Sequence, residues 1–141
     1  MVVVDGQGIP LGSTLASASP AEVKLAEQTL EAIKVPRSGK GRPKKRPARL
    51  IGDKAYDSDP LDQRLKEEKD IELIAPHKQN RKRTKTQDGR KLRRYRRRWK
   101  VERLFAWLHN FRRLPIRYEY HAENFLGMIQ LGCAIILMRL F

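Results

Sequence analysis

The chain has 141 residues, of which 31 are Lys or Arg and 16 are Asp or Glu, so its formal net charge at pH 7 is +15. This length suits one domain or part of a larger one, and a single cysteine, Cys133, excludes a disulfide framework and a zinc site built from cysteine pairs. The N-terminus lacks the basic and apolar segments of a signal peptide, and the most apolar stretch, 124–138, is too short to span a bilayer. We therefore expect a cytoplasmic protein with no membrane partner.

The first predicted elements are a hairpin and a helix. Apolar residues 2–4 and 9–11 flank an Asp5-Gly6 turn, which is a strong hairpin signal. A helix is expected over 19–33, because Ser19-Pro20 is a typical helix start and the apolar residues that follow share one face: Val23, Ala26, Leu30 and Ile33.

A basic loop and a βαβ unit follow. Residues 36–47 are rich in Pro, Gly and basic side chains and are expected to form a flexible loop. A strand is expected over 48–53, a helix over 61–69, and a second strand over 71–76 that ends at a proline. Two strands joined by a helix predict an α/β fold. Residues 77–89 show no periodicity and are expected to form a second basic loop, mobile in isolation.

Two long helices are expected to complete the chain. The first covers 90–113, and the second covers 122–140 and is simplest to interpret as core. The apolar side of the first consists of Leu92, Trp99, Leu104, Leu108 and Phe111. Phe105, Trp107 and Leu108 are expected in the core, Cys133 as a buried small hydrophobe, and His77 and His121 as loop or cap residues.

The positive charge is concentrated in one segment. Residues 78–100 contain 13 Lys or Arg and one acid, whereas 1–77 contain 13 bases and 12 acids and 101–141 contain five and three. A basic patch of this density attracts polyanions, and the Tyr95 and Trp99 rings inside it provide faces for bases or sugars. A solvated charged tail is the alternative. The pattern favours a docked surface that contacts nucleic acid.

Two acidic residues are candidate site residues. Asp53 follows an apolar strand and a glycine, which places it at the strand's C-terminal edge, where open α/β sheets assemble their sites. Glu102 shares one helix face with Tyr95, Arg98 and His109, at intervals of three, four and seven. Each acid also has a structural interpretation: Gly-Asp marks turns and N-caps, and a glutamate among arginines and lysines forms helix ion pairs.

Several motifs, in order, resemble one family. Residues 52–58, Gly-Asp-Lys-Ala-Tyr-Asp-Ser, resemble the second-aspartate motif of bacterial insertion-sequence transposases of the Asp-Asp-Glu (DDE) class. Residues 95–108 are similar to that family's Tyr-x2-Arg-x3-Glu signature, and residues 111–119 to its continuation. The resemblance covers nearly the whole chain, including the hairpin at 4–11.

The resemblance implies a ribonuclease H-like fold, a mixed sheet with flanking helices. In this family three acids hold two Mg²⁺ ions, with Mn²⁺ as a substitute, for phosphodiester cleavage and strand transfer at transposon ends. It implies that Asp53 and Glu102 are catalytic residues and metal ligands. The expected partners are transposon-end and target DNA, so the protein would associate with the nucleoid. DNA contacts are expected at Tyr95, Arg98, Arg94, Arg97, Lys100, Arg103, Arg112 and Arg113.

Two departures from the family pattern point to an incomplete enzyme. His109 stands where the signature has a lysine, and Arg112 or Arg113 is a possible substitute. The family's first aspartate lies upstream of the hairpin at which this chain begins, and Asp5 belongs to the hairpin turn. We therefore expect a truncated transposase that binds DNA non-specifically and has little activity alone. A homo-oligomer or a missing N-terminal partner chain would complete it.

Two other functions fit the same residues. The chain could be a non-catalytic DNA-binding remnant or regulator of the full-length transposase, or an RNA-associated basic protein. A pure binder should tolerate Glu102→Ala, or bind more tightly through lost repulsion, whereas an enzyme should lose turnover.

Overall fold

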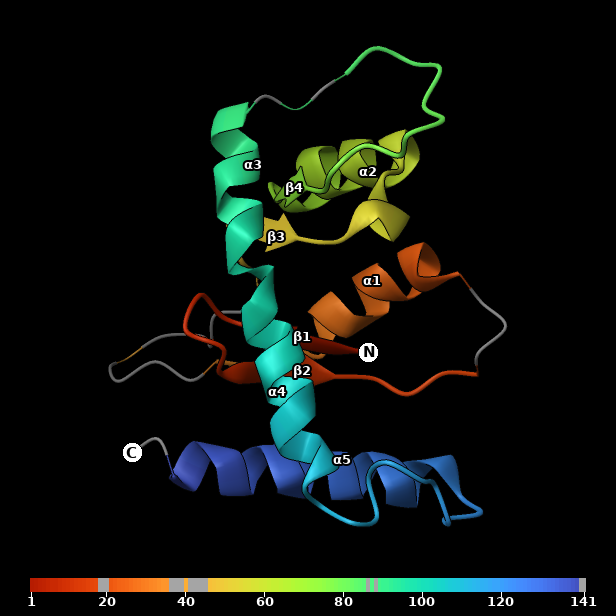
Figure 1. Ribbon diagram of the computed structural model, residues 1–141, viewed down its shortest axis with the longest axis vertical. Coiled ribbons are helices and arrows are strands. Elements are labelled where there is room, and N and C mark those ends of the chain that lie inside the picture. The colour runs from red at the N-terminus through yellow and green to blue at the C-terminus, as the bar shows by residue number, and fades with distance from the viewer. Residues whose placement is uncertain (18–20, 36–39, 41–45, 86, 88, 140–141) are drawn as a thin grey trace.

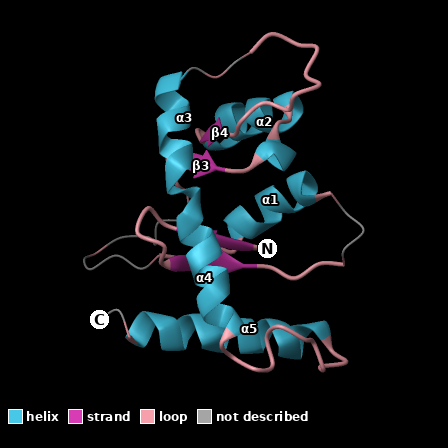
Figure 2. Cartoon of the chain, in the orientation of Figure 1, coloured by secondary structure: helices cyan, strands magenta, loops and turns pink. Residues whose placement is uncertain are grey.

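The chain folds into a mixed α/β arrangement of small sheets and helices (Figures 1 and 2). The computed structural model describes residues 1–17, 21–35, 40, 46–85, 87 and 89–139. In chain order its elements are β1 (Val2–Val4), β2 (Pro10–Ser13), α1 (Glu22–Glu31), β3 (Arg49–Ile51), the 3₁₀ turn η1 (Lys54–Tyr56), α2 (Asp59–Lys69), β4 (Glu72–Ile74), α3 (Gly89–Tyr95), the 3₁₀ turn η2 (Arg96–Arg98), α4 (Trp99–His109) and α5 (Ala122–Met138).

The predicted N-terminal hairpin is confirmed. β1 pairs antiparallel with β2, with an irregularity between Val3 and Val4. The Asp5 carboxylate closes the turn: its Oδ1 accepts hydrogen bonds from the backbone N–H groups of Gln7 (2.7 Å) and Ile9 (2.9 Å). Gly8 has a φ of +93°, which a residue with a side chain rarely adopts.

The predicted βαβ unit is also confirmed. β3 and β4 are parallel neighbours, and α2 forms the crossover between them. Asp59, Pro60 and Asp62 in the first turn of α2 suit a helix start, because Pro lacks the N–H that would stay unpaired and acids favour the positive end of the helix dipole. The helix ends at Asp70, whose φ of 53° is left-handed. The crossover brings the C-terminal edges of two strands together.

Most of the buried apolar side chains form two clusters on opposite faces of the hairpin. The α1–α2 core consists of Ala26, Leu30, Ile33, Leu61, Leu65, Ile71 and Leu73. The α4–α5 core consists of Leu104, Leu108, Cys133 and Ile136. Val3 packs against the first core and Val2 and Val4 against the second, because successive side chains of a strand point to opposite faces. Figure 1 shows α2 and α5 on either side of β1 and β2.

Helix boundaries match the predictions in part. The predicted apolar face of the first helix is confirmed, with Ala26, Leu30 and Ile33 buried and Val23 packed against them. Ser19 and Pro20 lie outside the described residues, as do most of 36–47 and the last two residues. His121 is the N-cap of α5, as predicted. Cys133 is buried, as predicted, and burial raises the pKa of its thiol.

The prediction of one helix over 90–113 is wrong in detail. A 3₁₀ turn separates α3 from α4, and α4 ends at His109. A 3₁₀ turn has three residues per turn, so it aligns residues three apart, and Arg98 stacks on the Tyr95 ring there. Phe105 is exposed, contrary to prediction, because one step along the helix from buried Leu104 turns its side chain by about 100°. None of the described helices is long and apolar enough to cross a membrane.

Candidate active site

Asp53 stands directly beyond the end of β3. The Gly52 N–H donates to the Ile74 carbonyl (3.0 Å) and extends the pairing with β4 by one residue. A Cβ at Gly52 would lie 2.8 Å from the Tyr56 ring, so no larger residue fits there. The Asp53 Oδ1 accepts the Ala55 N–H (2.8 Å) and caps η1. The predicted position of Asp53 at the strand edge is therefore confirmed, and so is the N-cap interpretation.

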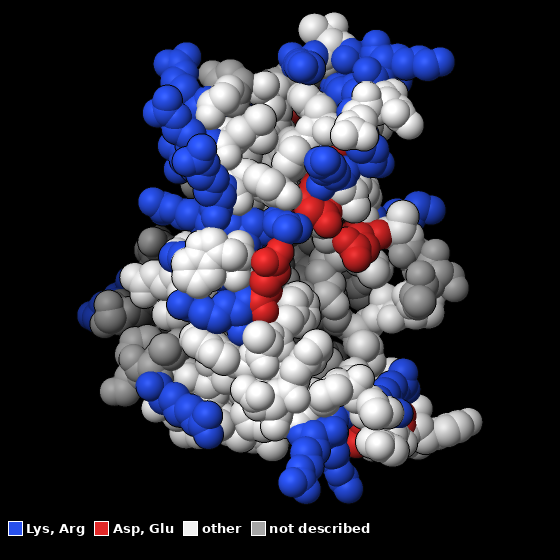
Figure 3. Space-filling model, viewed as in Figure 1, with Lys and Arg blue, Asp and Glu red and all other residues white. Residues whose placement is uncertain are grey.

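A second acid shares the electrostatic surroundings of Asp53. Burial, together with the negative charges of Glu22 and Asp53, raises the pKa of Tyr56 to about 12. Glu22 opens α1, which packs against η1. Figure 3 shows acidic side chains gathered in the middle of one face, with basic side chains around them. Sequence patterns gave no sign of Glu22, because a tertiary contact between distant segments places it there.

Glu102 lies on an exposed face of α4. Its Oε1 forms an ion pair with the Arg98 Nη2 (2.7 Å), and the Arg98 guanidinium lies 5.4 Å from the centre of the Tyr95 ring. The spacing argument is thus confirmed for these three residues, which form one continuous row of contacts. The fourth member of the predicted face, His109, is the exposed last residue of α4.

Some of the predicted DNA contacts have structural roles within the chain. Lys100 donates from Nζ to the Gly6 carbonyl, and Arg103 donates from Nη2 to the Gln7 carbonyl (2.8 Å). The Arg103 guanidinium also lies over the rings of two tryptophans, one turn before and one turn after it, at 4.9 and 4.8 Å. These two cations hold the hairpin turn against α4.

The other predicted DNA contacts are available at the surface. Arg94, Arg97, Arg112 and Arg113 are exposed, and Arg113 lies 4.0 Å from the Glu119 carboxylate. Figure 3 shows basic side chains along α3 and the start of α4. This surface can attract a polyanion without reading its sequence.

The carboxylates alone do not form a complete metal site. Their oxygen donors suit a hard divalent cation. Within the described ranges, however, no three Asp, Glu, His or Cys side chains are grouped closely enough to hold a metal ion. Asp53 and Glu102 each interact with a near neighbour in sequence, and Asp5 is committed to its turn. Further ligands from outside this set would be needed.

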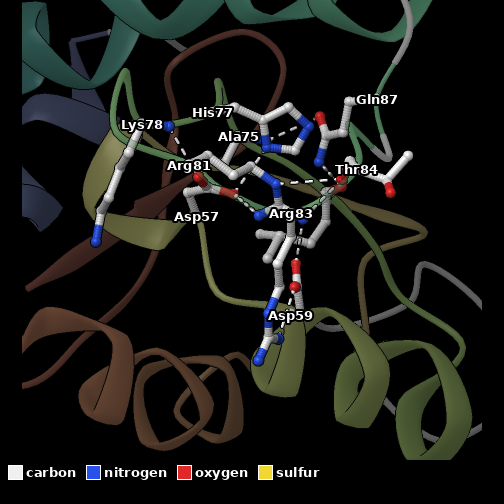
Figure 4. Close-up of polar contacts among 10 residues, drawn as sticks. Asp57, Asp59, Ala75, His77, Lys78, Arg81, Arg83, Thr84 and Gln87 are labelled. Carbon is white, nitrogen blue, oxygen red and sulfur yellow. Dashed lines mark hydrogen bonds and ion pairs between the residues drawn. The ribbon is translucent and has the colours of Figure 1, made fainter.

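A buried polar cluster beside the Asp53 turn was not predicted. Asp57, the residue after η1, interacts with His77 (2.8 Å) and Arg81 (2.7 Å), and its other carboxylate oxygen accepts the Lys78 N–H (2.8 Å) (Figure 4). Burial raises the pKa of Asp57, but the hydrogen bonds from Lys78 and His77 and the charge of Arg81 outweigh it and lower that pKa below its ordinary value. The segment after β4 is therefore anchored, which differs from the mobile loop expected.

Comparisons with known proteins identify the family. Residues 1–137 match the family described as "Transposase DDE domain". The chain is 35% identical over 135 residues to a Burkholderia cepacia protein named "Putative transposase for insertion sequence element IS402". That match covers 96% of this chain and 60% of the relative, so the chain spans less than two thirds of the relative's length. No solved structure matches the chain. The sequence therefore establishes that this chain belongs to the family of transposase DDE domains.

Proposed function

We propose that the chain supplies Asp53 and Glu102 to the catalytic centre of a DDE transposase, which cleaves and transfers DNA strands at transposon ends. The observation that carries the proposal is the row of contacts from Tyr95 through Arg98 to Glu102, in a chain of this family. The position of Asp53 at the edge of a parallel strand pair supports it.

Each residue has a role that its contacts support. Bound Mg²⁺, or Mn²⁺ as a substitute, would supply the activation of the attacking oxygen and the stabilisation of the leaving oxygen. Asp53 uses one carboxylate oxygen for its cap, which leaves the other for a ligand. Arg98 holds the Glu102 carboxylate in an ion pair. On leaving Glu102, its planar guanidinium can bind a DNA phosphate instead.

DNA binding belongs to the same proposal. Four exposed arginines of α3 and η2 are placed to contact the phosphate backbone of transposon-end or target DNA: Arg93, Arg94, Arg96 and Arg97. The further ligands would come from a second copy of the chain or from a partner chain.

The proposal extends to the fold: the two small sheets would belong to one ribonuclease H-like sheet. Each described sheet has two strands, so every strand has one edge without a strand partner. A strand that joins the two sheets would cover two of these edges. Fusing to this chain the part of the Burkholderia relative that the match does not cover should raise its melting temperature. No rise would contradict this arrangement.

The test of catalysis compares Glu102→Gln and Asp53→Asn in that fused protein. Nicking of supercoiled plasmid in Mn²⁺ should fall by about a hundredfold or more in both variants, because each removes a charged metal ligand. The matched control is Glu68→Gln, an exposed carboxylate on α2 with no described contact, which should keep full activity. Nicking that survives in Glu102→Gln would overturn the catalytic assignment.

A non-catalytic DNA-binding role is the second candidate. The observation that favours it is the lack of a three-ligand group among the described residues. If the fused protein and all its variants bind DNA without nicking it, and Glu102→Gln binds more tightly, the regulatory role replaces the catalytic one.

A further inference from the structure

We propose that residues 77–85, here called the strap, form a further contact surface for the DNA backbone, and that Asp57 is the positioning residue that holds the strap in place. The proposal rests on the proposed function, because it takes DNA as the partner. In Figure 1 the strap leaves β4, passes over α2 and leads towards α3.

The strap is held by a clamp of charged groups at the start of α2. The Arg81 guanidinium donates from Nη1 to Asp57 Oδ1 (2.7 Å) and from Nη2 to Asp59 Oδ1 (2.6 Å). His77 Nδ1 lies 2.8 Å from the same Asp57 oxygen. An ionised carboxylate can only accept, so this histidine nitrogen carries the proton. Figure 4 shows these groups converging.

Further bonds fix the shape of the strap and its far end. Arg81 also donates to the Thr84 carbonyl from Nε (3.3 Å) and Nη2 (3.2 Å), which folds the strap back on itself. Beyond the strap, the Gln87 side-chain amide donates to the Leu73 carbonyl (3.0 Å) and accepts the Ala75 N–H (3.1 Å). The Gln87 side chain therefore makes one donor and one acceptor bond to the backbone of the β4 segment, as the backbone of a neighbouring strand would.

Three members of the clamp are largely buried, so they depend on one another. The side chains of Asp57, His77 and Arg81 are 6, 11 and 10% exposed. Without the Asp57 charge, Arg81 keeps, among the described residues, only its ion pair with Asp59, whose side chain is 33% exposed. Removal of one partner from a buried ion pair is strongly unfavourable. The strap should therefore lose its fixed position when Asp57 loses its charge.

The strap has more positive charge than the clamp neutralises. It contains five Lys or Arg and no Asp or Glu. Asp57 and Asp59 engage Arg81 and Arg83, whereas the strap's other cations are exposed and have no described ion pair: Lys78, Lys82 and Lys85. In Figure 4 the Lys78 side chain points away from the clamp.

A phosphate backbone is the partner that suits this surface. Three exposed lysines on an anchored loop provide point charges at fixed positions, which suits a repeating row of phosphates. The strap leads along the chain to the arginines of α3, so the two basic surfaces can contact one duplex.

The decisive variant is Asp57→Asn, because two explanations predict opposite signs. It removes a negative charge, so simple electrostatics predicts tighter DNA binding. Loss of the strap's position predicts weaker binding, with a salt slope of log K against log salt that falls by about 1 or more, one phosphate contact. Binding of this chain to a labelled 30-base-pair duplex is measured by fluorescence anisotropy across a salt series. The control Glu68→Gln makes the same charge change away from the clamp and should bind as tightly as wild type or tighter.

A second pair of variants does not depend on the clamp's stability. Lys82→Gln with Lys85→Gln should lower the salt slope by about 1.8, two phosphate contacts. The matched control, Lys24→Gln with Lys66→Gln, removes two exposed cations from α1 and α2 and should change the slope less. If circular dichroism shows that Asp57→Asn is unfolded, this pair decides.

The outcomes separate the strap from the proposed function. Tighter DNA binding by folded Asp57→Asn, or equal salt slopes for the two lysine pairs, would overturn the proposal for the strap. DNA binding through α3 would remain intact. Absence of binding by the wild-type chain at low salt would overturn both.

Discussion

The α1–α2 core and the α4–α5 core differ in how completely this chain covers them. In the first, Leu61 and Leu65 are fully buried among side chains from α1, α2 and β4. In the second, Leu104 is fully buried, yet the same two helices expose Phe105 (41%), Leu131 (61%) and Met138 (72%). Apolar composition alone therefore does not make a helix part of the core.

The two candidate ligands lie in halves that the chain covers to different degrees. The Asp53 turn and the clamp belong to the well-covered half, whereas Glu102 belongs to the half with exposed apolar side chains. The hairpin connects the two halves, since Val3 packs on one core and Val2 and Val4 on the other. The relative placement of the two candidate ligands depends on this hairpin.

The largest expected effect comes from shortening a leucine side chain in each half. Leu65→Ala should lower the free energy of unfolding by about 2–5 kcal/mol, because it leaves a cavity in a closed core. Leu131→Ala should change it by less than about 0.5 kcal/mol, because that side chain is already exposed. Urea unfolding followed by circular dichroism measures both. Equal losses would mean that α5 is covered in solution.

A second comparison uses two glycines of α5. A Cβ at Gly132 would lie 3.0 Å from Leu114 Cδ1 and 3.1 Å from Leu108 Cδ2, so Gly132→Val should overpack the α4–α5 core and cost about 1–3 kcal/mol. A Cβ at Gly127 meets nothing within 4 Å, so Gly127→Ala should stabilise the helix by about 0.5–1 kcal/mol. The same urea titration measures both, and a Gly132→Val variant as stable as wild type would show that α4 and α5 do not pack tightly at this position.

Local patterns predicted the parts of the fold that depend on near neighbours. Helix periodicity identified the buried face of α1, and spacings of three and four placed Tyr95, Arg98 and Glu102 in contact. The hairpin followed from its Asp-Gly turn, and the βαβ unit from two apolar runs around a helix. In each case the information lies in the pattern of one element or of elements that follow one another in the chain.

Local sequence patterns did not predict the clamp. Asp57 and Arg81 are 24 residues apart, and nothing in the sequence around either residue indicates that the two will pair. Arginines in a basic run are usually solvated, yet the Arg81 side chain is largely buried because Asp57, before α2, and Asp59, at the start of α2, lie opposite it. The 3₁₀ break between α3 and α4 was missed for a similar reason, since helix propensity continues through Arg96–Arg98.

The smallest and most specific expected effect is acid sensitivity of the better-covered half. Hydrogen bonds from Arg81 and Arg83 lower the pKa of Asp59, and hydrogen bonds from Lys91 and Arg49, partly offset by burial, lower that of Glu72. A carboxyl whose pKa is lowered by folding stabilises the fold above its unfolded pKa of about 4. That contribution is lost as the pH falls through the lower, folded pKa.

Acid should therefore weaken the α1–α2 half, and Asp57 offers the way to test this. Its pKa is also lowered, so the urea midpoint should fall between pH 7 and pH 3, and Asp57→Asn should make this pH dependence smaller. Both tryptophans lie on α4. If acid weakens the α1–α2 half first, circular dichroism should report loss of helix at a lower urea concentration than tryptophan fluorescence, which reports on α4. A pH dependence as large in Asp57→Asn as in wild type would show that the clamp does not hold the strap through the Asp57 charge.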